Sequence, residues 1–418
     1  MTSPVTDRRL KPLPMVSAWF AAQHNQDQEA IADNLVLALF PLWQIMRFTE
    51  LDASTTLWLP SVLPRVETTF LQSQRLSAVF NANVRAAELP TDIPLVFDLP
   101  DVEIPPNVPA SSFELPPTVI EVDRTPQAPA TPALDAESQR VAEQIARGRD
   151  AGTPQWVLDR IQRIDDIRTG KASQDRIELQ QFDRADVAKT LTIEANYKTK
   201  AAMPGKEREL MHNALVRSSG GAVREALNGG RGVTDRVMKK DRKIKGFARV
   251  TDANPCALCA LLASRGAVFG KGSFIEQDKQ WKLSPEAARD VPDGWTNVAK
   301  IHDNCRCMLR PVYSTESTWD AGAKHYLQLW KDLKPTKDDV DAIRKQYPDM
   351  KGYLFERAVN RRAYRRAVEA DPFPGGQFDL NLMRRDVSER RDALLDAGMP
   401  ADSPNVRWHE RTLGLLAG

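Results

Sequence analysis

Cysteine is scarce in this sequence and confined to one place. The chain has 4 cysteines in 418 residues, and all of them lie between Cys256 and Cys307. Secreted proteins that depend on disulfides distribute their cysteines more widely, so this clustering argues against that class. The first thirty residues also lack a basic start followed by an apolar core and a small-residue cleavage site, so we expect no secretory signal.

Long apolar runs and a dominant charge are also missing. The longest apolar stretch, Leu35 to Met46, is interrupted by Pro41 and Gln44 and is shorter than the roughly 20 residues that a membrane-spanning helix needs. We interpret it as a buried helix or helix pair and expect no membrane contact. With 58 basic and 56 acidic side chains, any attraction to nucleic acid must come from a local patch.

Changes in composition divide the chain into five segments. Residues 90–134 hold a proline-rich, acidic linker or strap, because 11 of the 29 prolines lie between Pro90 and Pro132 and proline favours extended backbone. Apolar periodicity predicts helices on both sides of it. We therefore predict a mainly α fold with these parts: an N-terminal helical domain at 1–89, the linker at 90–134, a helical region with a basic end at 135–245, a small α+β Cys/His module at 246–313, and a C-terminal helical region at 314–418.

Several helix ends have their own signals. Asn228-Gly229-Gly230 is typical of a helix terminus, since glycine can adopt the left-handed conformation found there, so we expect the helix that starts near residue 205 to end at 228. Thr336 with Asp339 three residues later predicts a capping box at a helix start. Gly398 is expected to end a helix that begins near Asp379.

Two stretches are locally basic. Between Arg231 and Arg249 there are eight Lys or Arg residues against two Asp, which indicates either a solvated face or a contact with DNA, RNA or an acidic protein. The candidate nucleic-acid contacts are Arg236, Lys239, Lys240, Arg242, Lys243 and Lys245. Further on, a predicted helix carries a basic face opposite Phe355, Val359 and Ala363, formed by Arg357, Arg361, Arg362, Arg365 and Arg366.

The four cysteines and one histidine form the single chemical constellation of the sequence. Cys256-x2-Cys259 is expected at the start of a short helix, and His302-x2-Cys305-x-Cys307 at the approach to a strand. Two pairs of soft ligands of this kind can close a tetrahedron on a structural zinc ion. Zinc needs four ligands, so the predicted set is Cys256, Cys259, Cys305 and either His302 or Cys307.

Two other interpretations of this constellation stay open. The cysteines can pair as disulfides or remain reduced in a core. Alternatively, a cysteine at a helix N-terminus can form a thiolate and act with His302 as a nucleophile. A nucleophile needs only one cysteine, so four clustered cysteines favour a shared structural centre.

These residues resemble a known family. CALCALLASRGAVF followed by HDNCRC is similar to the MuF-like phage head-morphogenesis domain, in the version found in tailed phages of actinobacteria, over about residues 205–313. The family's motif residues correspond to Cys256, Cys259, His302, Cys305 and Cys307. Many members have proline directly after the histidine, where this chain has Asp303.

The resemblance implies a minor capsid protein inside the virion or procapsid, assembled in the host cytoplasm. Its implied partners are the portal protein and the major capsid and scaffold proteins, with a secondary contact to DNA. Some members carry the label of capsid maturation protease. Such an enzyme would use Cys256 or Cys259 with His302, or a serine such as Ser264, but no serine triad is evident and we expect no enzyme activity. A zinc-stabilised nucleic-acid-binding module is the remaining alternative.

Overall fold

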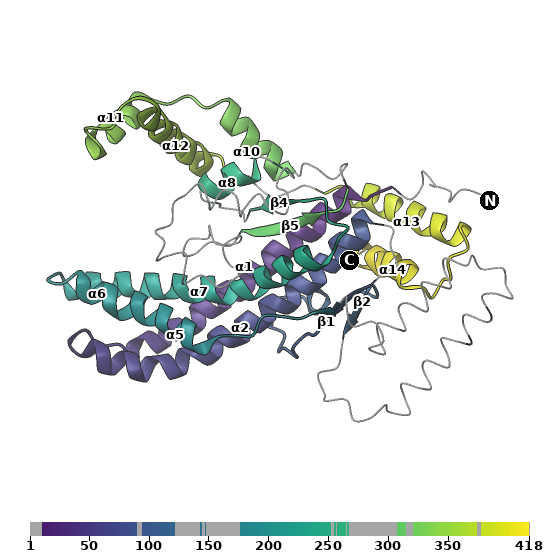
Figure 1. Ribbon diagram of the computed structural model, residues 1–418, viewed down its shortest axis with the longest axis horizontal. Helices are drawn as coiled ribbons and strands as arrows, with labels where there is room; N and C mark the ends of the chain where they lie inside the picture. Colours follow the sequence, from purple (N-terminus) through teal and green to yellow (C-terminus); the bar gives the residue numbers. More distant parts are fainter. Residues whose placement is uncertain are drawn as a thin grey trace.

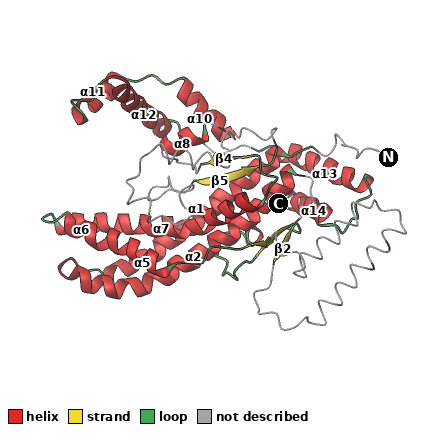
Figure 2. Ribbon diagram, in the orientation of Figure 1, coloured by secondary structure: helices red, strands yellow, loops and turns green. Residues whose placement is uncertain are grey.

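The computed structural model describes residues 11–89, 94–121, 143, 147, 176–251, 255, 257–264, 266, 307–314, 321–373 and 378–417. Most of these residues lie in helices, and two small sheets complete the described parts (Figures 1 and 2). The predicted mainly helical fold is therefore confirmed.

Two long helices from the N-terminal segment form the centre of the molecule. Helices α1 (Pro14–Leu42) and α2 (Leu51–Glu88) run in opposite directions, joined by the short 3-10 helices η1 (Trp43–Ile45) and η2 (Phe48–Glu50). The start of α1 lies beside the end of α2, where the Leu13 amide donates to the Ala87 carbonyl at 2.9 Å. Every residue from Leu76 to Glu88 is buried, so this end of α2 is covered on all sides.

Helix α7 (Glu207–Lys240) packs along α2 and α1 (Figure 1). The prediction that this helix ends at Asn228-Gly229-Gly230 is wrong, because the helix continues through both glycines. A Cβ on Gly230 would meet Ser77 Oγ and would lie 2.6 Å from Ser73 Oγ. The glycines therefore allow α7 to approach α2 closely, and this tertiary packing outweighs their low helix propensity.

Shorter elements flank the other end of α7. Asp183 caps α5 (Arg184–Thr192) by accepting hydrogen bonds from the amides of Ala185 and Asp186 at 2.9 and 3.0 Å. A π-helical turn, Ile193–Tyr197, leads into α6 (Lys198–Ala201). Together with α2 and α7 these helices bury an apolar cluster that includes Leu191, Ala195 and Ala222.

The proline-rich segment packs against the helices over its described part. Strand β1 (Leu95–Phe97) pairs in parallel with β2 (Val119–Glu121) and β3 (Arg176–Ile177), with the 3-10 helix η3 (Ala110–Ser112) between the first two strands. Arg75 on α2 donates to the Phe113 carbonyl at 3.0 Å. Residues 90–93 and 122–134 of the predicted linker lie outside the described part.

The C-terminal helices pack in two different places (Figure 1). Helices α10 (Ala321–Lys331), α11 (Lys337–Gln346) and α12 (Gly352–Ala370) lie on the side of α8. Helices α13 (Leu380–Asp396) and α14 (Pro404–Ala417) return to α1 and α2, where Trp408 Nε1 donates to Asn83 Oδ1 at 2.9 Å. The capping box of Thr336 and Asp339 and the helix end at Gly398, with a φ of 83°, are confirmed.

Among the described residues, no single helix is long and apolar enough to cross a membrane. The bent pair Pro14–Ile45 and Phe48–Glu88 reaches that threshold only by the length and composition of the two parts taken together.

Candidate functional site

The predicted Cys/His module is built on a two-stranded antiparallel sheet. Strand β4 (Gly246–Val250) pairs with β5 (Met308–Val312), with Gly246 opposite Val312 and Val250 opposite Met308. All five residues of β5 are buried, because α2 and α7 contact this strand while α8 (Ala257–Ala263) and α1 contact β4. The module is therefore embedded against the long helices (Figure 1).

Two of the five predicted zinc ligands lie in the described part of the module. Cys259 on α8 has no exposed surface, and Cys307, directly before β5, is also buried. Arg249 on β4 donates a hydrogen bond from Nη2 to Cys259 Sγ at 3.2 Å. Cys256, His302 and Cys305 lie outside the described residues.

The described residues alone do not form a metal centre. Within them, no group of three or more His, Cys, Asp or Glu side chains could hold an ion. Since that part of the chain contains only two of the five predicted ligands, the zinc site stays a prediction.

A network of buried polar side chains connects the predicted Cys/His module to α2. Glu88 accepts hydrogen bonds from Ser17 Oγ at 2.7 Å and from the Tyr313 amide at 2.8 Å, and Arg310 Nη1 lies 3.7 Å from its carboxylate. Close by, Arg85 on α2 pairs with Asp241 at 2.7 Å. Burial, followed by the charge of Asp241, raises the pKa of Tyr313 well above its usual value.

This network was not predicted from the sequence. Arg310 stands in an otherwise apolar strand, Met308 to Val312, which is a signal that a charged residue there needs a buried partner. The partner, Glu88, precedes it by more than 200 residues, so nothing in the local pattern could identify it.

The basic stretch from Arg231 to Arg249 divides into buried and exposed members. Arg231 and Arg249 are buried, at 4% exposure each. Arg236 donates to the Glu178 carbonyl, and Lys239 pairs with Asp235 at 2.8 Å. The exposed members surround the turn between α7 and β4: Lys239, Lys240, Arg242, Lys243 and Lys245. The structure therefore gathers five of the six predicted nucleic-acid contacts on one exposed turn.

Ser264, the serine considered for a protease, is buried at the end of α8. Its hydroxyl donates to the Leu261 carbonyl at 2.7 Å, and its exposure is 3%. A nucleophile must reach its substrate and needs an adjacent base. The Ser264 hydroxyl is instead buried and donates its hydrogen bond to the backbone of its own helix, which does not fit the role of a nucleophile.

Comparison with protein families finds a similarity over part of the chain. The model of the VG15 protein family matches residues 169–332, which include α5 to α8, the β4–β5 sheet and all four cysteines. VG15 is a family of phage proteins, so the match supports a phage protein associated with the virion, and it does not identify the MuF-like head-morphogenesis family specifically. Neither curated proteins nor solved structures give a match.

Proposed function

We propose that this protein is a minor head protein of a phage and acts in procapsid assembly near the portal. The observation that supports this proposal best is that two sequence similarities fall on the same part of the chain. The VG15 family model matches residues 169–332, and the cysteine pattern that resembles MuF-like head-morphogenesis domains lies inside the same range.

The arrangement of the elements supports an assembly role. The module is fastened to the long helices through buried contacts such as Glu88 with Tyr313, while basic residues are exposed at the α7–β4 turn and on α12. A rigid body with separate charged surfaces can contact two partners at once. The proposed partners are the portal protein and the major capsid or scaffold proteins, inside the procapsid.

The contact with DNA is proposed to be secondary. The exposed cluster of Lys239, Lys240, Arg242 and Lys243 is compact, whereas a protein that mainly binds DNA usually has a broader basic surface. Binding to phosphates releases counterions, so DNA retention should fall steeply as salt rises.

Co-purification with the portal protein tests the proposal. The full chain and the portal protein are co-expressed, and the complex is washed at rising salt, with DNA retention measured in parallel. We expect the portal complex to survive moderate salt. Replacing Lys239, Lys240, Arg242 and Lys243 by Ala should weaken DNA retention and leave portal binding nearly unchanged. If portal binding instead disappears with these four changes, the basic turn is the docking surface and DNA contact is not its role.

The capsid maturation protease remains a second candidate because the resembling family carries that label. Co-expression with the major capsid protein distinguishes the two. Capsid cleavage that is lost in Cys256→Ala or Cys259→Ala, with an unchanged melting temperature, would establish the protease. We expect no cleavage by the unmodified chain, because Cys259 is fully buried and Ser264 bonds to its own helix.

A further inference from the structure

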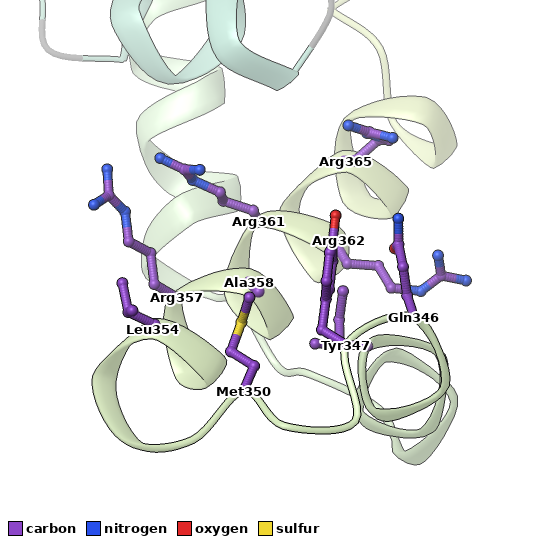
Figure 3. A pocket seen from close by; sticks show the side chains of 10 residues that line it. Gln346, Tyr347, Met350, Leu354, Arg357, Ala358, Arg361, Arg362 and Arg365 are labelled. Carbon is purple, nitrogen blue, oxygen red and sulfur yellow. The ribbon is translucent and has the colours of Figure 1, made fainter. Parts of the chain in front are cut away.

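Helices α11 and α12 enclose a hollow with an apolar floor and a basic rim. The hollow has a volume of about 460 Å³. Its floor includes Ile343, Met350 and Ala358, and its rim includes Arg357, Arg361 and Arg365. Figure 3 shows Met350 and Ala358 between Arg357 and Leu354 on one side and Tyr347 and Gln346 on the other.

The three rim arginines are available for a partner. Arg357, Arg361 and Arg365 are exposed, and no carboxylate among the described residues pairs with them. The neighbouring arginines on α12 differ in this respect. Arg366 lies 3.0 Å from the carboxylate of Asp339, and Arg362 lies 3.7 Å from the same carboxylate. Residues four apart on a helix have Cβ atoms about 6 Å from each other. The rim is therefore a row of three regularly spaced positive charges.

The apolar part of the hollow is also unusually exposed. Leu354 is 61% exposed and Tyr347 is 44% exposed. Both line the hollow beside the arginines. An amphipathic partner segment can cover apolar and charged side chains that lie next to each other in this way.

The walls of the hollow are held in place by buried contacts. Asp339 closes the capping box with Thr336 at the start of α11 and binds Arg366 of α12. On its other face α12 buries Tyr364 and Val368 in a cluster with Ala260 and Ala263 of α8. The hydroxyl of Tyr364 donates to the Tyr326 carbonyl at 3.1 Å. The hollow is thus a feature of a packed structure.

We propose that this hollow binds an acidic, amphipathic segment of a partner protein. Carboxylates of the segment would pair with Arg357, Arg361 and Arg365, and an apolar side chain would enter the hollow beside Leu354. A nucleic-acid backbone would satisfy the arginines but leave the apolar floor uncovered, so the combination favours a peptide. This inference does not depend on the proposed head role, because it uses only the chemistry of the hollow.

A designed peptide tests the proposal on the full chain. The probe is a fluorescein-labelled 16-residue helical peptide with Leu on one face and Glu on both borders, measured by fluorescence anisotropy. Arg357→Gln, Arg361→Gln and Arg365→Gln together should weaken binding roughly tenfold or more, since three charge pairs are lost. Leu354→Gln should weaken it separately. All four positions are exposed, so the fold should be kept, which an unchanged melting temperature verifies.

Two controls isolate the cause. Lys240→Gln, Arg242→Gln and Lys243→Gln remove the same charge from the α7–β4 turn and should leave peptide binding unchanged. A peptide with Gln in place of every Glu should bind more weakly to the unmodified chain. Equal peptide binding by the unmodified chain and the Arg357/Arg361/Arg365 variant would overturn the proposal. So would a single-stranded DNA oligonucleotide that binds more tightly than the peptide and loses that binding in this variant, because the hollow would then be a nucleic-acid site.

Discussion

The carboxylate of Glu88, at the last residue of α2, accepts a hydrogen bond from the backbone amide of Tyr313 at 2.8 Å. These residues are separated by 225 positions in the sequence. Tyr313 follows directly after β5, so this contact joins the predicted Cys/His module to the N-terminal helices. Glu88 therefore attaches the module to the end of α2 through a buried contact.

Replacing Glu88 by Ala should strongly destabilise the protein. The change removes the carboxylate from beside Arg310, a buried guanidinium, and removes the acceptor of the Tyr313 amide. Breaking a buried charge pair from one side costs about 3–5 kcal/mol of unfolding free energy. Urea denaturation followed by circular dichroism measures the loss.

The matched control for Glu88 is Glu121→Ala. Glu121 also pairs with an arginine, Arg75, at 3.1 Å, but its side chain is 38% exposed. A pair of this kind contributes about 0–1 kcal/mol. Equal losses in the two variants would contradict the role assigned to Glu88.

The close approach of α7 to α2 predicts opposite outcomes for two helical glycines. Gly230→Ala places a Cβ about where Ser73 and Ser77 already lie, and overpacking of this kind costs about 1–3 kcal/mol. Gly414→Ala, on α14, has nothing within 4 Å of the new Cβ. It should stabilise the protein by about 0.5–1 kcal/mol, because alanine favours a helix more than glycine does. Thermal melting of both variants measures the difference, and a stabilising Gly230→Ala would refute the close packing.

The helices and their ends were largely predictable, whereas the packing between distant segments was not. The signals at Thr336 and Gly398 act within one turn of the chain, and the structure confirms both. Gly230 carries the same local signal as Gly398 but is buried against α2, so propensity gave the wrong helix end. Helical propensity alone cannot distinguish these glycines, because the difference lies in a helix more than 100 residues away.

The same distinction between local signals and packing of distant segments applies to the candidate site. The sequence identified the cysteine pattern and the exposed basic turn, both of which are local features. It did not identify Arg249 as the hydrogen-bond donor to Cys259, and it counted Arg231 and Arg249 in the basic stretch although both are buried. A count of charges along a chain does not distinguish a buried arginine from an exposed one.

The buried His24 should make the protein less stable in acid. Burial lowers the pKa of His24 from 6.5 to about 3, in a site where its ring stacks on Phe80 with centroids 4.4 Å apart. As the pH falls from 6.5 towards 3, unfolded His24 binds a proton and folded His24 does not, so unfolding becomes more favourable by up to about 1.4 kcal/mol per pH unit.

A substitution separates this effect from other titrations. His24→Gln keeps a polar group near Ser77, which lies 3.3 Å from the His24 ring, but cannot be protonated. Unfolding free energies measured from pH 7 to pH 4 should decline less steeply in this variant. Asp27, whose pKa is raised to about 6 mainly by burial, acts in the opposite direction, because its folded form binds a proton first and gains stability as the pH falls through 6. Identical pH slopes for the variant and the unmodified chain would contradict the role of His24.

The zinc hypothesis predicts one metal ion per chain. Elemental analysis of protein purified without chelators should give one zinc, and Cys305→Ser should remove it and destabilise the module strongly. Ser264→Ala is a suitable control, since Ser264 is buried nearby on α8 but is not a predicted ligand. Protein that contains no metal and no free thiols would instead support disulfide pairing.

The proposed head role is tested most directly by the composition of procapsids. Procapsids purified from infected cells are analysed by quantitative mass spectrometry, with the portal protein as the internal reference for one vertex. We expect this chain to be present in procapsids in a number of copies comparable to that of the portal and far below that of the major capsid protein. Procapsids that contain the portal but none of this chain, isolated at a stage when the chain is abundant in the cell, would rule out the proposed head role.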